Sequence, residues 1–199
     1  MSIESRETMV VHAEPASAGS VFLGPRHKSF PPHSWGSTAE QFLEDEPVIG
    51  DFQTPLLTLD SSAVRHNVEL MADWLTANGL QIAPHGKTTM APLLWRQLID
   101  AGAWGLTLAT AWQVQFARSV GIDRVLLANE LVDPVAIGWL AAELDGHPDF
   151  EFACWSDSLQ SVRVMETVLE DVGAGRPIDV LVELGAVGGR TGARDLATA

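Results

Sequence analysis

Lys87 is the residue of this sequence best placed to do chemistry, because it follows a short apolar run and precedes the next amphipathic segment. An amine at such a junction binds a phosphate or a carboxylate, or attacks a carbonyl carbon. Most lysines, however, are ordinary surface residues. The residue type and its position therefore leave a reactive amine and an ordinary loop lysine both open.

Residues 86–88, Gly-Lys-Thr, match the end of the phosphate-binding P-loop pattern G-x-x-x-x-G-K-[ST]. Gln81 occupies the position where that pattern requires its first glycine. The residues that should form a flexible anion-binding loop are instead the apolar run 80–84. Because the upstream half of the P-loop pattern is missing, the sequence argues against nucleotide hydrolysis.

The composition limits the class of protein. The 199-residue chain is 46% hydrophobic, enough for a buried core, and has 26 acidic against 12 basic residues, a net charge of −14. Negative potential opposes binding to nucleic acids and anionic membranes. No apolar run approaches the roughly 20 residues of a membrane-spanning helix, and no secretory signal is recognisable at the N-terminus. Cys154 is the only cysteine, so no intrachain disulfide is expected. We expect a cytoplasmic protein.

The pattern of residue types changes near residue 50. Residues 1–50 carry scattered prolines, glycines and polar residues without a sustained period, which predicts an irregular N-terminal arm. From residue 51 onward apolar strand-like runs alternate with amphipathic segments, which is typical of βα units and a mainly parallel sheet. The predicted strands are 56–59, 80–84, 104–109, 124–128, 150–155 and 178–182.

Helix boundary signals support this alternation. Asp60 and Thr110 can cap helices, and Pro92 and Pro134 fit the first helical turn, where a missing N–H costs little. The spacing of Asp157 to Gln160 fits a capping box. An apolar stripe, made of Val64, Val68, Met71, Ala72 and Leu75, predicts a helix that ends at Asn78-Gly79.

Strand units spaced by roughly two dozen residues, with helices that share no common sequence, favour a (β/α)₈ TIM barrel over a repeat array. An open doubly wound sheet is the alternative. A barrel needs eight strands, and about five barrel strands are recognisable in residues 51–199. We therefore expect an incomplete barrel with exposed strand edges, in which the remaining strands and a C-terminal β-domain are absent.

Five ordered motifs resemble one family. The run 83–92, Ala-Pro-His-Gly-Lys-Thr-Thr-Met-Ala-Pro, is similar to the lysine motif of the D-threonine aldolase and D-serine dehydratase group, most closely its amino acid deaminase branch. The other motifs follow in the same order as in that group: Thr54-Pro55-Leu56 through Leu59-Asp60 and His66-Asn67, then Ala101-Gly102-Ala103-Trp104-Gly105 with Ala109-Thr110, Leu127-Ala128-Asn129, and Glu183-Leu184-Gly185 with 188–192. The resemblance covers residues 30–194.

This resemblance implies an alanine racemase N-terminal type of barrel that binds pyridoxal 5′-phosphate. Lys87 would form the Schiff base with the cofactor, and its amine would also move the α-proton. Arg190, in the loop Gly-x-x-Arg-x-Gly, would pair with the phenolic oxygen of the cofactor. His85 would pack on the cofactor ring or donate to it, although a histidine at this place can equally satisfy loop carbonyls.

Other residues carry weaker signals. Asn129 fits both a pocket wall and a helix cap. Glu130 departs from the family, where glutamine is expected. Cys154 lies between Phe152 and Trp155 and reads as a small core residue. The histidines lack the spacing of a metal site, so no metal ligand is predicted; in the resembled families a divalent metal binds in the C-terminal β-domain, beyond residue 199.

The resemblance implies a lyase or deaminase acting on a small D-amino acid such as D-serine or D-threonine, with pyridoxal phosphate supplying the chemistry. Aldol cleavage and deamination both remain open. The alternatives are a non-catalytic pyridoxal-phosphate homeostasis protein, an inactive fragment and an amino-acid racemase. We expect no nucleic-acid or membrane partner, and a homodimer for the full-length protein.

Overall fold

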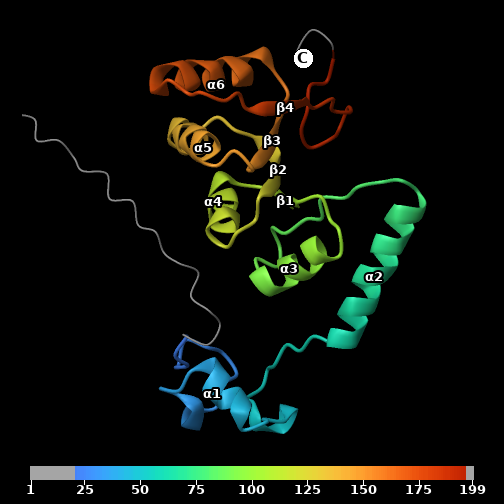
Figure 1. The fold of residues 1–199 in the computed structure, drawn as a ribbon, viewed down its shortest axis with the longest axis vertical. Helices are drawn as coiled ribbons and strands as arrows, with labels where there is room; N and C mark the ends of the chain where they lie inside the picture. The colour runs from blue at the N-terminus through green and yellow to red at the C-terminus, as the bar shows by residue number, and fades with distance from the viewer. Residues whose placement is uncertain (1–20, 196–199) are drawn as a thin grey trace, which may run out of the picture. The chain divides into compact units, whose positions relative to one another are not determined.

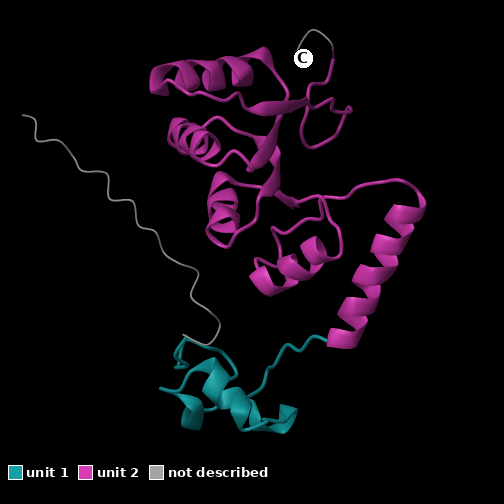
Figure 2. Cartoon of the chain, in the orientation of Figure 1, with its two compact units in different colours: residues 1–60 teal, residues 61–199 magenta. Residues whose placement is uncertain are grey.

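The computed structural model describes residues 21–195. The chain divides into two compact units, Met1–Asp60 and Ser61–Ala199, which Figure 2 colours separately. The domain boundary near residue 50 that the sequence indicates stays a prediction.

The first unit is built from short helical turns around a small aromatic cluster. Its elements are the 3-10 turn η2 (Pro32–Ser34), helix α1 (Ala39–Glu44) and the 3-10 turn η3 (Ile49–Asp51). The rings of Phe30, Phe42 and Phe52 meet edge to face, with centroids 5.5 to 5.6 Å apart. Edge-to-face pairs place the positive ring edge against the negative ring face, which stabilises such clusters.

The predicted strand at 56–59 is wrong. These residues form no strand and pair with no other segment, and Leu57 is 91% exposed. An extended apolar run becomes a strand only when a neighbour accepts its backbone hydrogen bonds, and no described segment does so here.

The second unit alternates helices and strands, as the sequence predicts (Figure 1). In chain order its elements are α2 (Ser61–Ala77), α3 (Pro92–Asp100), β1 (Leu106–Leu108), α4 (Ala111–Ser119), β2 (Arg124–Glu130), α5 (Pro134–Gly146), β3 (Glu151–Ser156), α6 (Leu159–Val172) and β4 (Asp179–Val182). Among the described residues, none of these helices combines the length and apolar character that crossing a bilayer requires.

The four strands form one parallel sheet in the order β1-β2-β3-β4. Leu106 pairs with Val125, Val125 with Phe152, and Cys154 with Val180. The expectation of an α/β fold with a parallel sheet is confirmed. Because every strand points the same way, all the strand carboxyl ends lie along one edge of the sheet.

The predicted strand at 80–84 is only partly formed. Residues 82–86 run beside β1, and His85 bridges Thr107 in parallel, but no regular strand is present. Pro84 lacks an N–H, so this segment cannot complete a ladder. It nevertheless extends the strand order by one position on the outer side of β1.

Helices α4, α5 and α6 cover one face of the sheet (Figure 1), and the core lies between them and the strands. Fully buried side chains include Leu108, Val125, Ile137 and Phe150. Thr110 caps α4, as predicted, and Asp133 caps α5, with Pro134 in the first turn as predicted. The predicted cap Asp157 is wrong, because Ser158 is the N-cap of α6 and its hydroxyl accepts from the Ser161 N–H at 3.3 Å.

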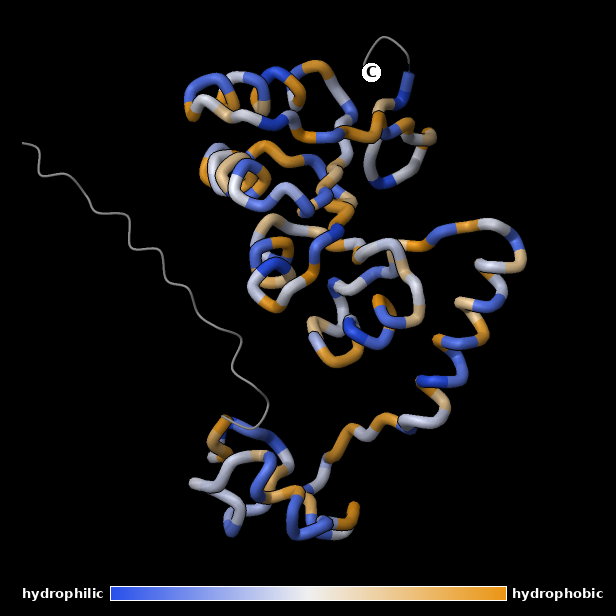
Figure 3. Tube along the Cα trace, in the orientation of Figure 1, coloured by the Kyte–Doolittle hydropathy of each residue, from blue (hydrophilic) through white to orange (hydrophobic). Residues whose placement is uncertain are grey.

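Two apolar surfaces of the second unit are uncovered. Helix α2 forms where the stripe predicts it, yet none of its residues is buried, and hydrophobic and polar residues alternate along it in Figure 3. Trp74 is 54% exposed. Strand β4 bonds only to β3, and all four of its residues are exposed. The expectation of an exposed strand edge is confirmed for the part of the chain that the structure describes.

Candidate functional site

Lys87 stands at the carboxyl-terminal edge of the sheet because the segment before it is tied to β1. The Trp104 N–H donates to the Ile82 carbonyl and the Thr107 N–H to the Pro84 carbonyl, both at 2.8 Å. The Gly86 N–H returns a bond to the Thr107 carbonyl at 2.9 Å. Residues 82–86 therefore run parallel to β1, and Lys87 follows where β1 ends.

The Trp95 indole fixes Gly86. Trp95 lies in α3 with no exposed surface, and its Nε1–H donates to the Gly86 carbonyl at 3.2 Å. A Cβ added to Gly86 would lie 2.8 Å from Trp95 Nε1 and 3.3 Å from Leu108 Cδ2. The indole thus occupies the space that any other side chain at position 86 would need.

Gln113 of α4 holds Lys87, the residue after Gly86. Its Nε2–H donates to the Lys87 carbonyl at 3.2 Å, and its Oε1 accepts from the Ala109 N–H at 2.9 Å. Asn129, in β2, then donates to the Ala109 carbonyl at 3.2 Å. These bonds link the ends of three neighbouring extended segments, and Asn129 acts here as a link within the sheet edge and not as a helix cap.

The Lys87 side chain is half-buried, and its amine makes no hydrogen bond or ion pair with the described residues. His85 is exposed, and its backbone pairs with Thr107. The main chain at Lys87 is thus well held while its amine is left free for a ligand.

Glu130 and Glu183 form a carboxyl pair farther along the same edge. Glu130 ends β2, and Glu183 follows β4. Burial, together with the negative charges of Asp157 and Glu183, raises the pKa of Glu130 above its ordinary value. Glu183 also accepts from the Thr191 hydroxyl at 2.5 Å. The glutamate that stands where glutamine is expected therefore holds its proton to a higher pH than an ordinary glutamate does.

The loop after β4 holds Arg190. Leu184 bridges Ala193, and the Gly185 N–H donates to the Ala193 carbonyl at 2.8 Å, so the loop closes on itself. Arg190 is exposed, and its guanidinium has no partner among the described residues. This loop follows β4, whereas Lys87 lies beside β1, so the two are at opposite ends of the strand order. No contact joins Arg190 to Lys87.

Arg194 is the residue that organises this loop. Its guanidinium donates to the carbonyls of Thr191, Gly192 and Gly189 at 2.5, 3.0 and 2.7 Å. Sequence reasoning singled out Arg190 and missed Arg194, because both are arginines of one glycine-rich stretch and only the contacts separate them.

Cys154 is confirmed as a core residue. It is fully buried, its Sγ lies 3.9 Å from the Met165 Sδ, and burial raises the pKa of the thiol to about 12. Such a thiol is protonated and unreactive near neutrality. Within residues 21–195, no group of three or more metal-binding side chains comes together.

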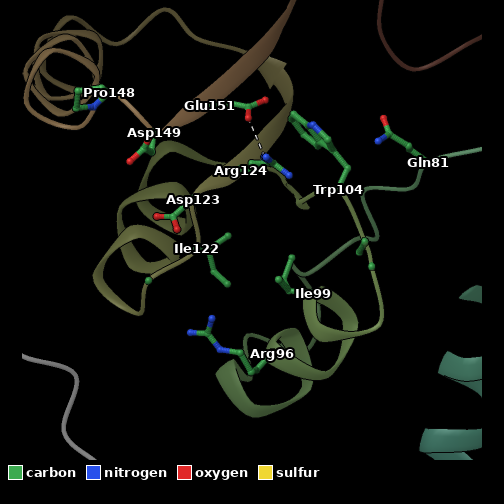
Figure 4. A pocket seen from close by; sticks show the side chains of 13 residues that line it. Gln81, Arg96, Ile99, Trp104, Ile122, Asp123, Arg124, Pro148, Asp149 and Glu151 are labelled. Atoms are coloured by element: carbon green, nitrogen blue, oxygen red, sulfur yellow. Dashed lines mark hydrogen bonds and ion pairs between the residues drawn. The ribbon is translucent and has the colours of Figure 1, made fainter.

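A cavity of the second unit lies at the other end of the sheet, where the strands begin (Figure 4). It has a volume of about 710 Å³, and its lining includes Trp104, Arg96 and the ion pair between Arg124 and Glu151, whose nitrogen and oxygen are 2.8 Å apart. Lys87 does not line it. Because active sites of βα folds gather at the carboxyl ends of strands, we place the candidate site at the Lys87 edge.

No protein-family model matches the chain. It is 26% identical over 142 residues to the D-threonine aldolase of Arthrobacter sp, which covers 71% of this chain and 36% of that protein. It is 33% identical over 93 residues to the 3-hydroxy-D-aspartate aldolase of Paracoccus denitrificans, over 46% of this chain and 24% of that protein.

The fold agrees with these sequence matches. The crystal structure of D-threonine aldolase from Filomicrobium marinum superimposes with a TM-score of 0.66 and 28% identity, over 73% of this chain and 38% of the aldolase. The chain thus spans less than two fifths of the length of the relatives it matches. The resemblance indicated by the motifs is confirmed: the chain is a homologue of D-threonine aldolase and 3-hydroxy-D-aspartate aldolase.

Proposed function

We propose that this chain carries the lysine-bearing part of a pyridoxal-phosphate-dependent lyase that acts on D-amino acids. Its relatives are aldolases of D-threonine and 3-hydroxy-D-aspartate. A D-amino acid with a polar group on its β-carbon, such as D-threonine or D-serine, is the corresponding substrate class.

One observation carries this proposal. The half-buried Lys87 amine has no partner among the described residues, while its main chain is fixed at the carboxyl-terminal edge of a parallel sheet. A surface lysine needs no such bracing of its backbone. A lysine that binds a cofactor covalently does, because its amine must stand at one place.

Three side chains would hold the cofactor, and two of them, Lys87 and Arg190, have charged groups without a partner among the described residues. Lys87 would hold the aldehyde carbon through its amine, Arg190 would pair its free guanidinium with the phenolic oxygen, and His85 would lie beside the ring. The bound cofactor would accept electrons from the α-carbon of the substrate. Lys87, once displaced by the substrate amine, would take up or return the α-proton.

The strand order supports a barrel as the complete fold. Residues 82–86 and β1 to β4 succeed one another in chain order, as neighbouring strands of a (β/α)₈ barrel do. A doubly wound sheet reverses its order at a switch point, and no reversal occurs in the described sheet. We therefore include in the proposal that these segments are consecutive strands of such a barrel.

The proposal is tested by adding pyridoxal phosphate to the chain and following the absorbance of the bound cofactor, then adding D- or L-amino acids. We expect a spectral change that Lys87→Ala abolishes and Lys28→Ala preserves. We also expect D-threonine or D-serine to perturb the bound spectrum more than the L-enantiomers do. Equal spectra for the wild type and Lys87→Ala would refute the assignment.

Product analysis separates the remaining alternatives. Glycine release from D-threonine indicates aldol cleavage, and ammonia release from D-serine indicates deamination. Conversion between enantiomers indicates a racemase. Lys87-dependent cofactor binding with none of these products would identify a non-catalytic cofactor carrier.

A further inference from the structure

Gln113 uses its side chain in an unusual way for a residue at the start of a helix. Thr110 caps α4, and its hydroxyl accepts from the Gln113 N–H at 3.3 Å. A glutamine at this third helical position normally folds back and accepts from the backbone N–H of the cap residue, which completes a capping box.

The first unit contains that ordinary arrangement. In α1 the Thr38 hydroxyl accepts from the Gln41 N–H at 3.1 Å, and the Gln41 Oε1 accepts from the Thr38 N–H at 2.9 Å. The same Thr-x-x-Gln spacing at 110–113 gives a different result. Gln113 accepts from Ala109, one residue earlier than the cap.

Because the Gln113 side chain binds Ala109 and not the cap residue Thr110, its amide nitrogen can reach another part of the fold. The Gln113 Nε2–H donates to the carbonyl of Lys87, 26 residues away in the sequence. Within the described part of the chain, the Lys87 main chain makes no other hydrogen bond. Gln113 is therefore what ties the lysine residue itself to β1 and α4, whereas Trp95 and Thr107 hold the segment before it.

We propose that Gln113 is a positioning residue that holds the Lys87 backbone so that the amine meets the aldehyde of pyridoxal phosphate. This inference rests on the proposed function. A backbone displaced by the loss of this bond would spread the amine over more positions, which lowers the fraction of molecules ready to react.

The sequence contains only two lysines, Lys28 and Lys87, so Lys28 is an internal control for reactivity. Lys28 is exposed and lies in the first unit. Pyridoxal phosphate is added to the full chain, each amine condenses with the aldehyde with loss of water, and borohydride delivers hydride to the resulting C=N bond. Mass spectrometry of the peptides then gives the ratio of adduct at Lys87 to adduct at Lys28.

Two variants separate positioning from charge. Gln113→Glu keeps an acceptor for the Ala109 N–H but replaces the donor to Lys87 with an oxygen that repels its carbonyl. Gln113→Met keeps the length and the helix propensity and adds no charge. Gln115→Glu is the matched control, because it makes the same charge change on α4 at a side chain with no hydrogen bond to the described residues.

We expect both Gln113 variants to lower the Lys87 to Lys28 ratio by about three- to tenfold, the effect of one hydrogen bond, and Gln115→Glu to leave it unchanged. Circular dichroism at the assay temperature establishes that each variant is folded. If a variant is less stable but its Lys87 amine is still held in place, its folded molecules keep the wild-type ratio of adduct at Lys87 to adduct at Lys28.

An unchanged ratio in folded Gln113→Met or Gln113→Glu would overturn the positioning role. An equal fall in Gln115→Glu would also overturn it, because charge on α4 would then be the cause. A wild-type chain that shows no preference for Lys87 over Lys28 would instead refute the proposed function, so the two failures are distinguishable.

Discussion

Glu130 and Glu183 bring their carboxyl groups together at the carboxyl-terminal edge of the sheet, and each keeps one buried oxygen without a hydrogen-bond partner among the described residues. Two ionised carboxylates in this arrangement repel each other and lack solvation. A single proton on Glu130 relieves both effects. Burial, together with the negative charges of Asp157 and Glu183, raises the pKa of Glu130.

The pair makes the stability of the fold depend on pH. The pKa of Glu130 is higher in the folded than in the unfolded chain, so the folded state binds a proton that the unfolded state has already released. Stability is therefore full below the unfolded pKa and falls as pH rises through the folded pKa. Glu130→Gln removes the ionisation and keeps a donor.

We expect Glu130→Gln to raise the thermal unfolding midpoint by about 2–4 °C at about pH 8 and to leave it nearly unchanged at about pH 4. Calorimetry or circular dichroism at both pH values measures this. Glu166→Gln, at an exposed position of α6, makes the same charge change and serves as the control. A gain of equal size in Glu166→Gln would mean that net charge, and not the pair, sets the effect.

Gly86→Ala should destabilise the second unit. The added methyl would lie 2.8 Å from the Trp95 Nε1, so the indole must shift and its hydrogen bond to the Gly86 carbonyl must break. Overpacking of this kind costs about 1–3 kcal/mol, which denaturant unfolding can measure.

Gly146→Ala is the matched control for this change. Gly146 ends α5, and no atom lies within 4 Å of the Cβ that would be added there. We expect its stability to be unchanged or slightly raised, because alanine favours the helix. Similar losses in the two variants would show that the Trp95 contact does not restrict position 86.

We expect Arg190 to bind the cofactor and Arg194 to hold the loop together. Arg190→Gln removes a guanidinium that has no partner among the described residues, so the unliganded chain should unfold at the same temperature. Its affinity for pyridoxal phosphate should fall about tenfold through loss of one charged contact. Arg194→Gln removes the donor to three loop carbonyls and should speed proteolysis within 185–192.

Fluorescence titration with pyridoxal phosphate and limited proteolysis measure these two effects. If Arg194→Gln weakened cofactor binding while Arg190→Gln bound normally, the assignment of Arg190 would be wrong.

The regular elements of the second unit were predictable because their patterns are local. The β-branched run at 178–182 becomes β4, and Thr110 and Asp133 cap the helices that they precede. The run at 56–59 has the same strand-like composition but no strand beside it. Strand formation depends on a partner, and a local pattern does not specify one.

In the candidate site, too, local motifs could be predicted from the sequence, whereas contacts between distant residues could not. Lys87 is visible in the sequence through its motif, whereas Gln113 reaches it across 26 residues. The Thr-x-x-Gln spacing at 110–113 predicts an ordinary capping box, and only the fold shows that the amide is used elsewhere. Similarly, the sequence shows that Glu130 stands where glutamine is expected, but its pairing with Glu183 becomes visible only when the carboxyl ends of β2 and β4 lie along one edge of the sheet.

The most direct test of the account is to map where pyridoxal phosphate attaches to the unmodified chain. After borohydride reduction, the pyridoxyl group should be found on Lys87 in at least about tenfold excess over Lys28 and the N-terminal amine, since one ordered contact to the cofactor corresponds to about that factor. An adduct distributed equally between Lys87 and Lys28 would contradict the claim that Lys87 is a cofactor-binding lysine.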